Sequence, residues 1–304
     1  MGRSLTYRRH LESLRKKLTS RVALLRRLDG SGWGARATTL RIANLALVHS
    51  TAEYCAPGWC RNVYTRLIHP AINEALRIVT GCLRHAPEDN LPILAVIQLA
   101  ELRRNGATLF LARPAVESGH LLHSALTCPP GANIRRLKSR LPFVLAAQQL
   151  ISSSDSNNIR TAHWADHQMK AEWLDNLTRL RTFIPDTGTH PPGMALPRTA
   201  WVRLNRLLTF GHFRSCLHKW GMASSAAFEC DAKEQTIDHV VLQCPAHRPP
   251  RGLHGMTVLD DETIEWLLNT CPELFFFGDL SVIGQNVFEM TKKIKSFRPV
   301  CLKI

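Results

Sequence analysis

The sequence predicts a mainly α-helical protein. Leucine, isoleucine and valine recur at intervals of three and four residues across residues 1–115, as they do on the buried side of amphipathic helices. No stretch in that range shows the period-two alternation of a half-buried strand. An apolar content of 45% over 304 residues is enough for a sizeable core, and this length is typical of two domains.

The first predicted helix is amphipathic and strongly basic. Its apolar stripe begins at Leu11 and continues through Leu14, Leu18, Val22 and Leu25, and the turn-forming run Asp29-Gly30-Ser31-Gly32 ends it. Six basic residues lie between the apolar positions: Arg15, Lys16, Lys17, Arg21, Arg26 and Arg27. The pattern predicts a helix with one buried side and a charged remainder.

Three further helical patterns follow. One starts near Ala37, with Leu40, Leu45 and Val48 on one side. Another runs from about Asn62 and can be closed by Gly81. The last opens at Asn90 and Pro92 and extends in one or two pieces to Pro114. We expect these segments to pack as helical hairpins.

The second half of the chain is divided by polar and proline-rich segments. Residues 152–158 form a polar linker, residues 159–181 a helix with two tryptophans, and prolines interrupt residues 185–197. A helix pair over 201–220 and a short helix over 260–269 follow. The predicted organisation is a basic helical domain over 1–150, a linker and tryptophan-containing helix over 151–198, a small helical domain over 199–272 and a divergent tail over 273–304.

The charge predicts a polyanionic partner. Thirty-nine Lys and Arg against 24 Asp and Glu give a net charge of +15, and residues 1–50 contribute 11 basic and two acidic residues. The six basic residues of the first helix are the candidate phosphate contacts. Few aromatic residues lie nearby for base stacking, so we expect sequence-nonspecific contact with an RNA or DNA backbone. The alternatives are a solvated helix face, or one that binds an acidic partner or a membrane surface.

A cysteine- and histidine-containing segment near residue 240 resembles the second half of a zinc knuckle. Cys230, His239 and Cys244 are candidate Zn²⁺ ligands, and a fourth is sought among Cys216, His218 and His247. Phe228 stands where a Cys-x-Cys pair would place its first thiol. In the alternative interpretation, the two cysteines are small buried apolar residues and His239 is a partly exposed polar residue.

Catalytic motifs are missing from the sequence. It has no glycine-rich phosphate loop, His-Glu-x-x-His or Gly-x-Ser-x-Gly pattern. The pair Asp260-Asp261 precedes a helical pattern and is interpreted as an N-cap rather than a magnesium site. Sparse cysteines and the lack of an 18-residue apolar run favour an intracellular protein, nuclear or cytoplasmic, without a transmembrane segment.

Several blocks resemble the non-LTR (LINE-type, jockey-like) retrotransposon reverse transcriptases, in the region after the polymerase palm. Leu47–Trp59 is similar to the family's Leu-Val-x-Ser-x-x-Glu-Tyr-x-x-Pro-x-Trp block, and Asn73–Gly81 to its Asn-x-Ala-Leu-Arg-x-Ile-Thr-Gly helix. Leu91–Glu101 and Leu5–Leu11 are similar to flanking segments, and Cys230, His239 and Cys244 to its terminal knuckle. The resemblance covers about residues 3–272.

The resemblance implies a thumb-like helical region that grips a template–primer duplex, followed by a nucleic-acid-binding knuckle. The palm with its Asp-Asp motif and the endonuclease have no counterpart in this sequence, so no enzymatic activity is expected of the chain as it stands. Phe228 replaces a family cysteine and Asp231 a frequent glycine. The expected function is that of a reverse transcriptase fragment that binds RNA or DNA; the alternative is an inert product or an interaction protein.

Overall fold

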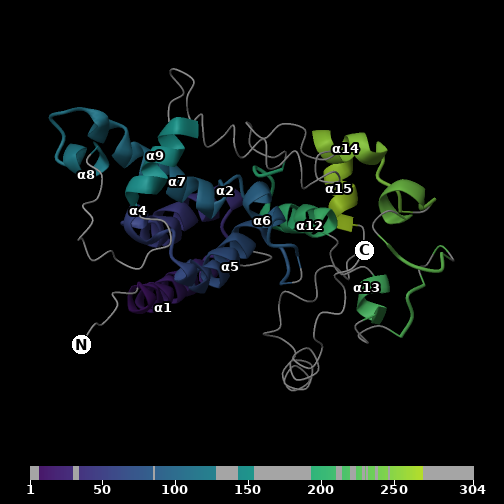
Figure 1. Cartoon of the computed structure of the whole chain (residues 1–304). Helices are drawn as coiled ribbons and strands as arrows, with labels where there is room; N and C mark the ends of the chain where they lie inside the picture. Colours follow the sequence, from purple (N-terminus) through teal and green to yellow (C-terminus); the bar gives the residue numbers. More distant parts are fainter. Residues whose placement is uncertain are drawn as a thin grey trace.

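The computed structural model describes residues 7–29, 34–84, 86–127, 143–153, 193–209, 214–219, 224–227, 230, 232–236, 239–245 and 247–269. Within these ranges all regular elements are helices and none is a strand, which confirms the mainly α fold (Figure 1). Three predicted features lie outside the described residues: most of the polar linker, the tryptophan-containing helix over 159–181 and the tail over 273–304.

Helix α1 (Arg8–Arg26) has the predicted apolar stripe. All five stripe residues, Leu11, Leu14, Leu18, Val22 and Leu25, are buried. They pack mainly against α5 (His69–Thr80), which lies alongside α1 in Figure 1. The apolar spacing was therefore sufficient to predict both the helix and its buried side.

The next helices are shorter than predicted. The pattern from Ala37 becomes α2 (Ala37–Asn44), the π-type turn η1 (Leu45–His49) and α3 (Ser50–Ala52). A short α4 (Ala56–Trp59) follows. The pattern from Asn62 divides into the 3-10 helix η2 (Val63–Leu67) and α5, because Pro70 lacks an N–H and favours the first turn of a new helix.

The pattern from Asn90 also forms two pieces, α6 (Asn90–Leu94) and α7 (Ala100–Ala112). The 3-10 helix η3 (Pro114–Val116) and α9 (Phe143–Ser153) pack beside α7, and α8 (His123–Thr127) packs against η3 and α9. One large apolar core joins α1 through α6, and a smaller one joins α7, α8 and α9. The N-terminal half thus combines longer helices, such as α1, α5 and α7, with several short ones.

Helix α12 (Arg198–Leu208) connects the two halves by capping the C-terminus of α5. The last carbonyls of a helix have no partner within it. Arg198 donates to the Ile78 and Val79 carbonyls, Trp201 Nε1 to Val79 O at 3.0 Å, and Asn205 Nδ2 to Thr80 O at 2.9 Å. Side chains of α12 therefore satisfy the end of a helix more than a hundred residues earlier.

The C-terminal region has a core of its own. It contains α13 (Arg214–Lys219), the π-type turn η4 (His239–Gln243), α14 (Gly252–Val258) and α15 (Asp261–Asn269). Trp201 and Leu204 of α12 pack there with Val240, Met256 and Leu267. The helix pair over 201–220 and the short final helix are confirmed in outline, and Asp260 Oδ1 accepts from Thr263 N as the predicted N-cap.

Across the residues that the structure describes, no helix has both the length and the apolar character needed to cross a membrane.

Candidate metal centre and nucleic-acid interface

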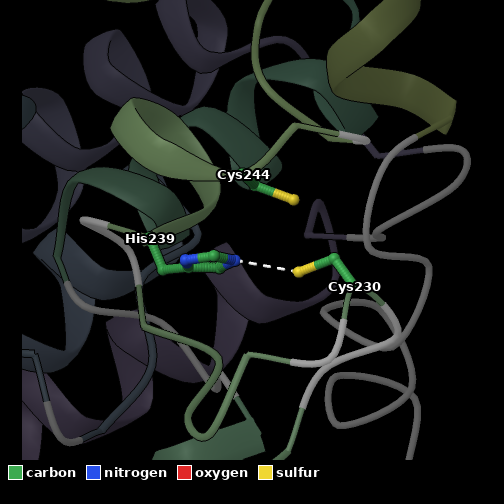
Figure 2. A group of neighbouring side chains, drawn as sticks. All are labelled: Cys230, His239 and Cys244. Carbon is green, nitrogen blue, oxygen red and sulfur yellow. Dashed lines mark hydrogen bonds between the residues drawn. The ribbon is translucent and has the colours of Figure 1, made fainter.

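Cys230, His239 and Cys244 converge on one point, as their spacing predicts. Their ligand atoms all lie within 4.8 Å of one another, and Cys230 Sγ is 3.0 Å from His239 Nε2 (Figure 2). Cys244 is fully buried, whereas Cys230 and His239 are half-buried. Soft thiolates with an imidazole form a donor set that suits Zn²⁺.

The π-type turn η4 brings His239 and Cys244 together. In an α-helix, residues five apart point about 140° away from each other, because each residue turns the helix by about 100°. Here Cys244 N donates to His239 O at 2.7 Å, a bond between residues five apart. This wider turn places the two side chains over one another, and π-type turns of this kind often occur at functional sites.

Hydrogen bonds and apolar packing hold the loop segments around the cluster. His239 N donates to Thr236 Oγ1, and Gln235 N donates to Ala226 O. On the other side of the turn, Val240 is fully buried in the C-terminal core. Trp266 Nε1 of α15 donates to His247 O at 3.0 Å, just beyond the cluster. His239 and Cys244 are therefore attached to a packed scaffold.

The distances fit a tetrahedral ion after small adjustments. Donors bound to Zn²⁺ at about 2.0–2.3 Å in a tetrahedron lie about 3.4–3.8 Å apart, so the donors here need to move by less than about 1 Å. The group could hold a metal ion.

Neither described histidine candidate for a fourth ligand belongs to this group. His218 on α13 and the His247 ring lie outside the group, although His247 N donates to Cys244 Sγ at 3.3 Å. The Cys216 side chain and Phe228 lie outside the described residues.

The basic residues of α1 surround its exposed sides rather than forming one surface. At about 100° per residue, Lys16 and Arg27 face directly away from the buried stripe, and Arg9 lies in the same row. Arg15 and Arg26 lie on one flank, and Lys17 and Arg21 on the other. A straight backbone cannot contact all three rows at once, and the sequence prediction did not include Arg9.

Intramolecular ion pairs engage part of this charge. Arg26 Nη2 contacts Glu74 Oε1 of α5 at 2.5 Å, and Arg8 Nε contacts Glu12 Oε1 at 2.9 Å. Both pairs lie on the flank that Arg15 shares. Within the described part of the chain, five of the six predicted contacts form no ion pair: Arg15, Lys16, Lys17, Arg21 and Arg27.

The Leu47–Trp59 block mostly stabilises the fold. Arg103 Nε and Nη2 of α7 donate to the two carboxylate oxygens of Glu53 at 2.6 and 2.8 Å, and Trp59 Nε1 donates to Tyr54 O. Burial alone would raise the pKa of Glu53, but hydrogen bonds from His49 and Arg103 outweigh it and lower that pKa. Glu53 is therefore an ionised anchor between α3 and α7.

Comparison with known proteins found no match: no family model, no curated protein and no solved structure is similar to this chain.

Proposed function

We propose that this chain is the C-terminal part of a non-LTR retrotransposon reverse transcriptase and binds the sugar–phosphate backbone of RNA or DNA. Helix α1 would supply the phosphate contacts, and Cys230, His239 and Cys244 would hold Zn²⁺ in a knuckle-like module. The chain itself would have no polymerase or nuclease activity. The Leu47–Trp59 and Asn73–Gly81 blocks support the family, and the structure of α1 supports the binding.

The observation that carries the binding proposal is the unbalanced charge of α1. Its apolar stripe is fully used in the core, so the basic residues extend from a fixed helix. Lys16, Arg27 and Arg9 form an exposed row without acidic partners among the described residues. Like charges on one helix repel each other, and a polyanion relieves that repulsion.

The test is the salt dependence of binding to a duplex of arbitrary sequence. Each phosphate contact contributes about −0.9 to the slope of log affinity against log salt concentration. A triple variant with Arg9→Glu, Lys16→Glu and Arg27→Glu should therefore flatten that slope by about 2–3 units. A sequence change in the duplex should have little effect, because backbone contacts carry no sequence information.

A matched control changes the same amount of charge elsewhere. Arg36, Arg66 and Arg84 are exposed and lie outside α1, and their triple change to Glu should leave most of the slope intact. Equal flattening by both variants would show that net charge acts instead of α1. If the wild-type chain ignores nucleic acid at moderate salt, the alternative of an acidic protein partner or an anionic membrane surface is favoured.

The zinc part of the proposal has its own test. The purified chain should contain about one zinc ion, and Cys244→Ser should lose it, because a thiolate ligand is removed. Cys216→Ser should weaken zinc binding only if Cys216 is the fourth ligand. If the chain is purified without chelators and contains no zinc, the metal hypothesis is wrong. The proposal that α1 binds nucleic acid would not be affected.

A further inference from the structure

A cleft of about 720 Å³ lies within the N-terminal half, and neither proposed site uses it. Its walls come from η1, η2 and α5 to α7, with α9 contributing Gln149 and Leu150. None of its described lining residues belongs to α1 or to the Cys230 cluster. Clefts of this size hold small organic ligands, which a few polar groups orient.

Arg104 is a buried cation at this cleft, and the nearest carboxylates, Glu101 and Glu53, act on its charge without forming a direct ion pair with it. Its side chain is 5% exposed; Nε donates to Ala100 O of its own helix, and Nη2 is 3.4 Å from His69 Nε2. Among the described residues no carboxylate forms an ion pair with it. Burial lowers the pKa of Arg104, and burial followed by the charge of Arg104 lowers that of His69. A buried guanidinium is costly unless an anion compensates it.

His49 is the second buried polar group that lines the cleft. It is 1% exposed, and its Nδ1 lies 3.3 Å from Glu53 Oε1. An ionised carboxylate can only accept, so Nδ1 is the donor to Glu53 and Nε2 is the ring nitrogen left for another partner. That Nε2 has no hydrogen-bond partner among the described residues. Buried polar atoms are nearly always paired, so Nε2 is a second hydrogen-bonding position beside the cleft.

We infer that this cleft binds a small phosphate-bearing ligand with hydroxyl or amino groups, of the nucleoside monophosphate class. Arg104 and Arg61, which both line the cleft, bind the phosphate, and His49 Nε2 forms a hydrogen bond with a hydroxyl or amino group. Ile72, Leu76 and Leu99 supply apolar surface for a flat ring.

The acidic rim of the cleft agrees with this ligand class. Glu88 is paired with Arg77 at 3.5 Å, and Asp89 and Glu101 are exposed. Glu101 lies three residues from Arg104 on α7, so acidic and basic groups stand side by side in the lining. The carboxylates can accept from amino groups of a base.

Alkylation of Cys60 in the wild-type chain tests this proposal. Cys60 lines the cleft and is half-buried, whereas Cys55 is exposed and does not line it. Adenosine monophosphate at about 10 mM, ten times a dissociation constant of about 1 mM, should slow iodoacetamide modification of Cys60 about tenfold. Cys55, on the same tryptic peptide, should react at an unchanged rate and serves as the internal control.

Two comparisons make the outcome decisive. Adenosine lacks the phosphate and should protect Cys60 far less; equal protection by adenosine, or none by the monophosphate, overturns the proposal. Both comparisons use the wild-type chain.

Variants of the cleft give a further check. Arg104→Met and the exposed His69→Gln should reduce the protection of Cys60, whereas Arg66→Met outside the cleft should retain it. Since α1 is not involved, its charge-reversed variant should bind the nucleotide normally.

Discussion

Gly81 meets two separate requirements that no other residue satisfies. It ends α5 with a φ of +73°, a conformation that side chains with a Cβ adopt at a cost. A Cβ there would also lie 2.4 Å from Val202 Cγ2 of α12, inside any real contact distance. The glycine that closes the Asn73–Gly81 block is thus fixed both by helix capping and by the approach of a distant helix.

Gly81→Ala should therefore destabilise the fold by about 2–3 kcal/mol, from backbone strain and overpacking together. The measurement is the free energy of unfolding from urea denaturation, followed by circular dichroism. Gly106→Ala in α7 is the matched control, because its added methyl group would meet no described atom within 4 Å and alanine favours a helix. Equal losses in the two variants would contradict the proposed close contact with Val202.

Glu53 gives a pH-dependent prediction. Its lowered pKa means that the ionised form stabilises the fold above the pKa of the unfolded chain, and that this contribution disappears as pH falls through the folded value. Glu53→Gln should cost about 2 kcal/mol at neutral pH, since it breaks the two-point contact with Arg103. The difference from wild type should shrink in acid, below the ordinary glutamate pKa.

Unfolding measured from pH 7 to pH 3 checks this prediction about Glu53. Glu12→Gln is the control, because the Arg8–Glu12 pair is exposed on α1 and solvent screening should leave it little effect on stability at any pH. A constant difference between wild type and Glu53→Gln across the range would show that packing, rather than charge, accounts for the loss.

At the level of elements, local patterns predicted helices well and their interruptions poorly. The stripe of α1 repeats within the helix itself, so spacing alone identified its buried side. The break before α5 and the π-type turns η1 and η4 depend on hydrogen-bond geometry that apolar spacing does not encode. The ion pair between Arg26 and Glu74 could not be predicted from the sequence either, because 48 residues separate the two side chains.

Local sequence spacing was likewise informative for one of the two candidate sites and not for the other. Cys230, His239 and Cys244 are close in sequence, so their spacing was informative. The cleft is lined by residues from His49 to Leu150, which are too far apart in the sequence for any local spacing to bring them together. Only the folded arrangement shows that Arg104 is buried and forms no ion pair among the described residues.

The docking of α12 onto α5 predicts that Arg198 contributes strongly to stability. Arg198 is 5% exposed and its guanidinium contacts the Val79 carbonyl at 2.8 Å, the Ile78 carbonyl at 2.5 Å and Asp29 Oδ1 at 2.7 Å. Arg198→Met should cost about 3–4 kcal/mol, because it leaves buried carbonyls unpaired and removes an ion pair. Arg66→Met, at an exposed position, should be nearly neutral. The midpoint of urea denaturation measures both.

In the whole molecule, two apolar cores meet at the junction between α5 and α12. The N-terminal core has long helices and many buried leucines, whereas the C-terminal one relies on short helices and the turn at η4. A bound metal would therefore matter more to the C-terminal core, where apolar burial is less extensive than around α1 and α5. Metal binding adds its free energy to the stability of the folded segment that contains the ligands.

Removal of zinc should accordingly loosen only part of the molecule. In hydrogen exchange measured by mass spectrometry, a chelator should speed exchange in residues 239–269 and leave α1 and α5 protected, because local opening follows local stability. Cys230→Ser in the presence of zinc should reproduce the pattern, since it removes one ligand without touching the buried Cys244. Faster exchange throughout the chain would mean that the two cores unfold as one unit, and unchanged exchange would mean that the cluster holds no stabilising metal.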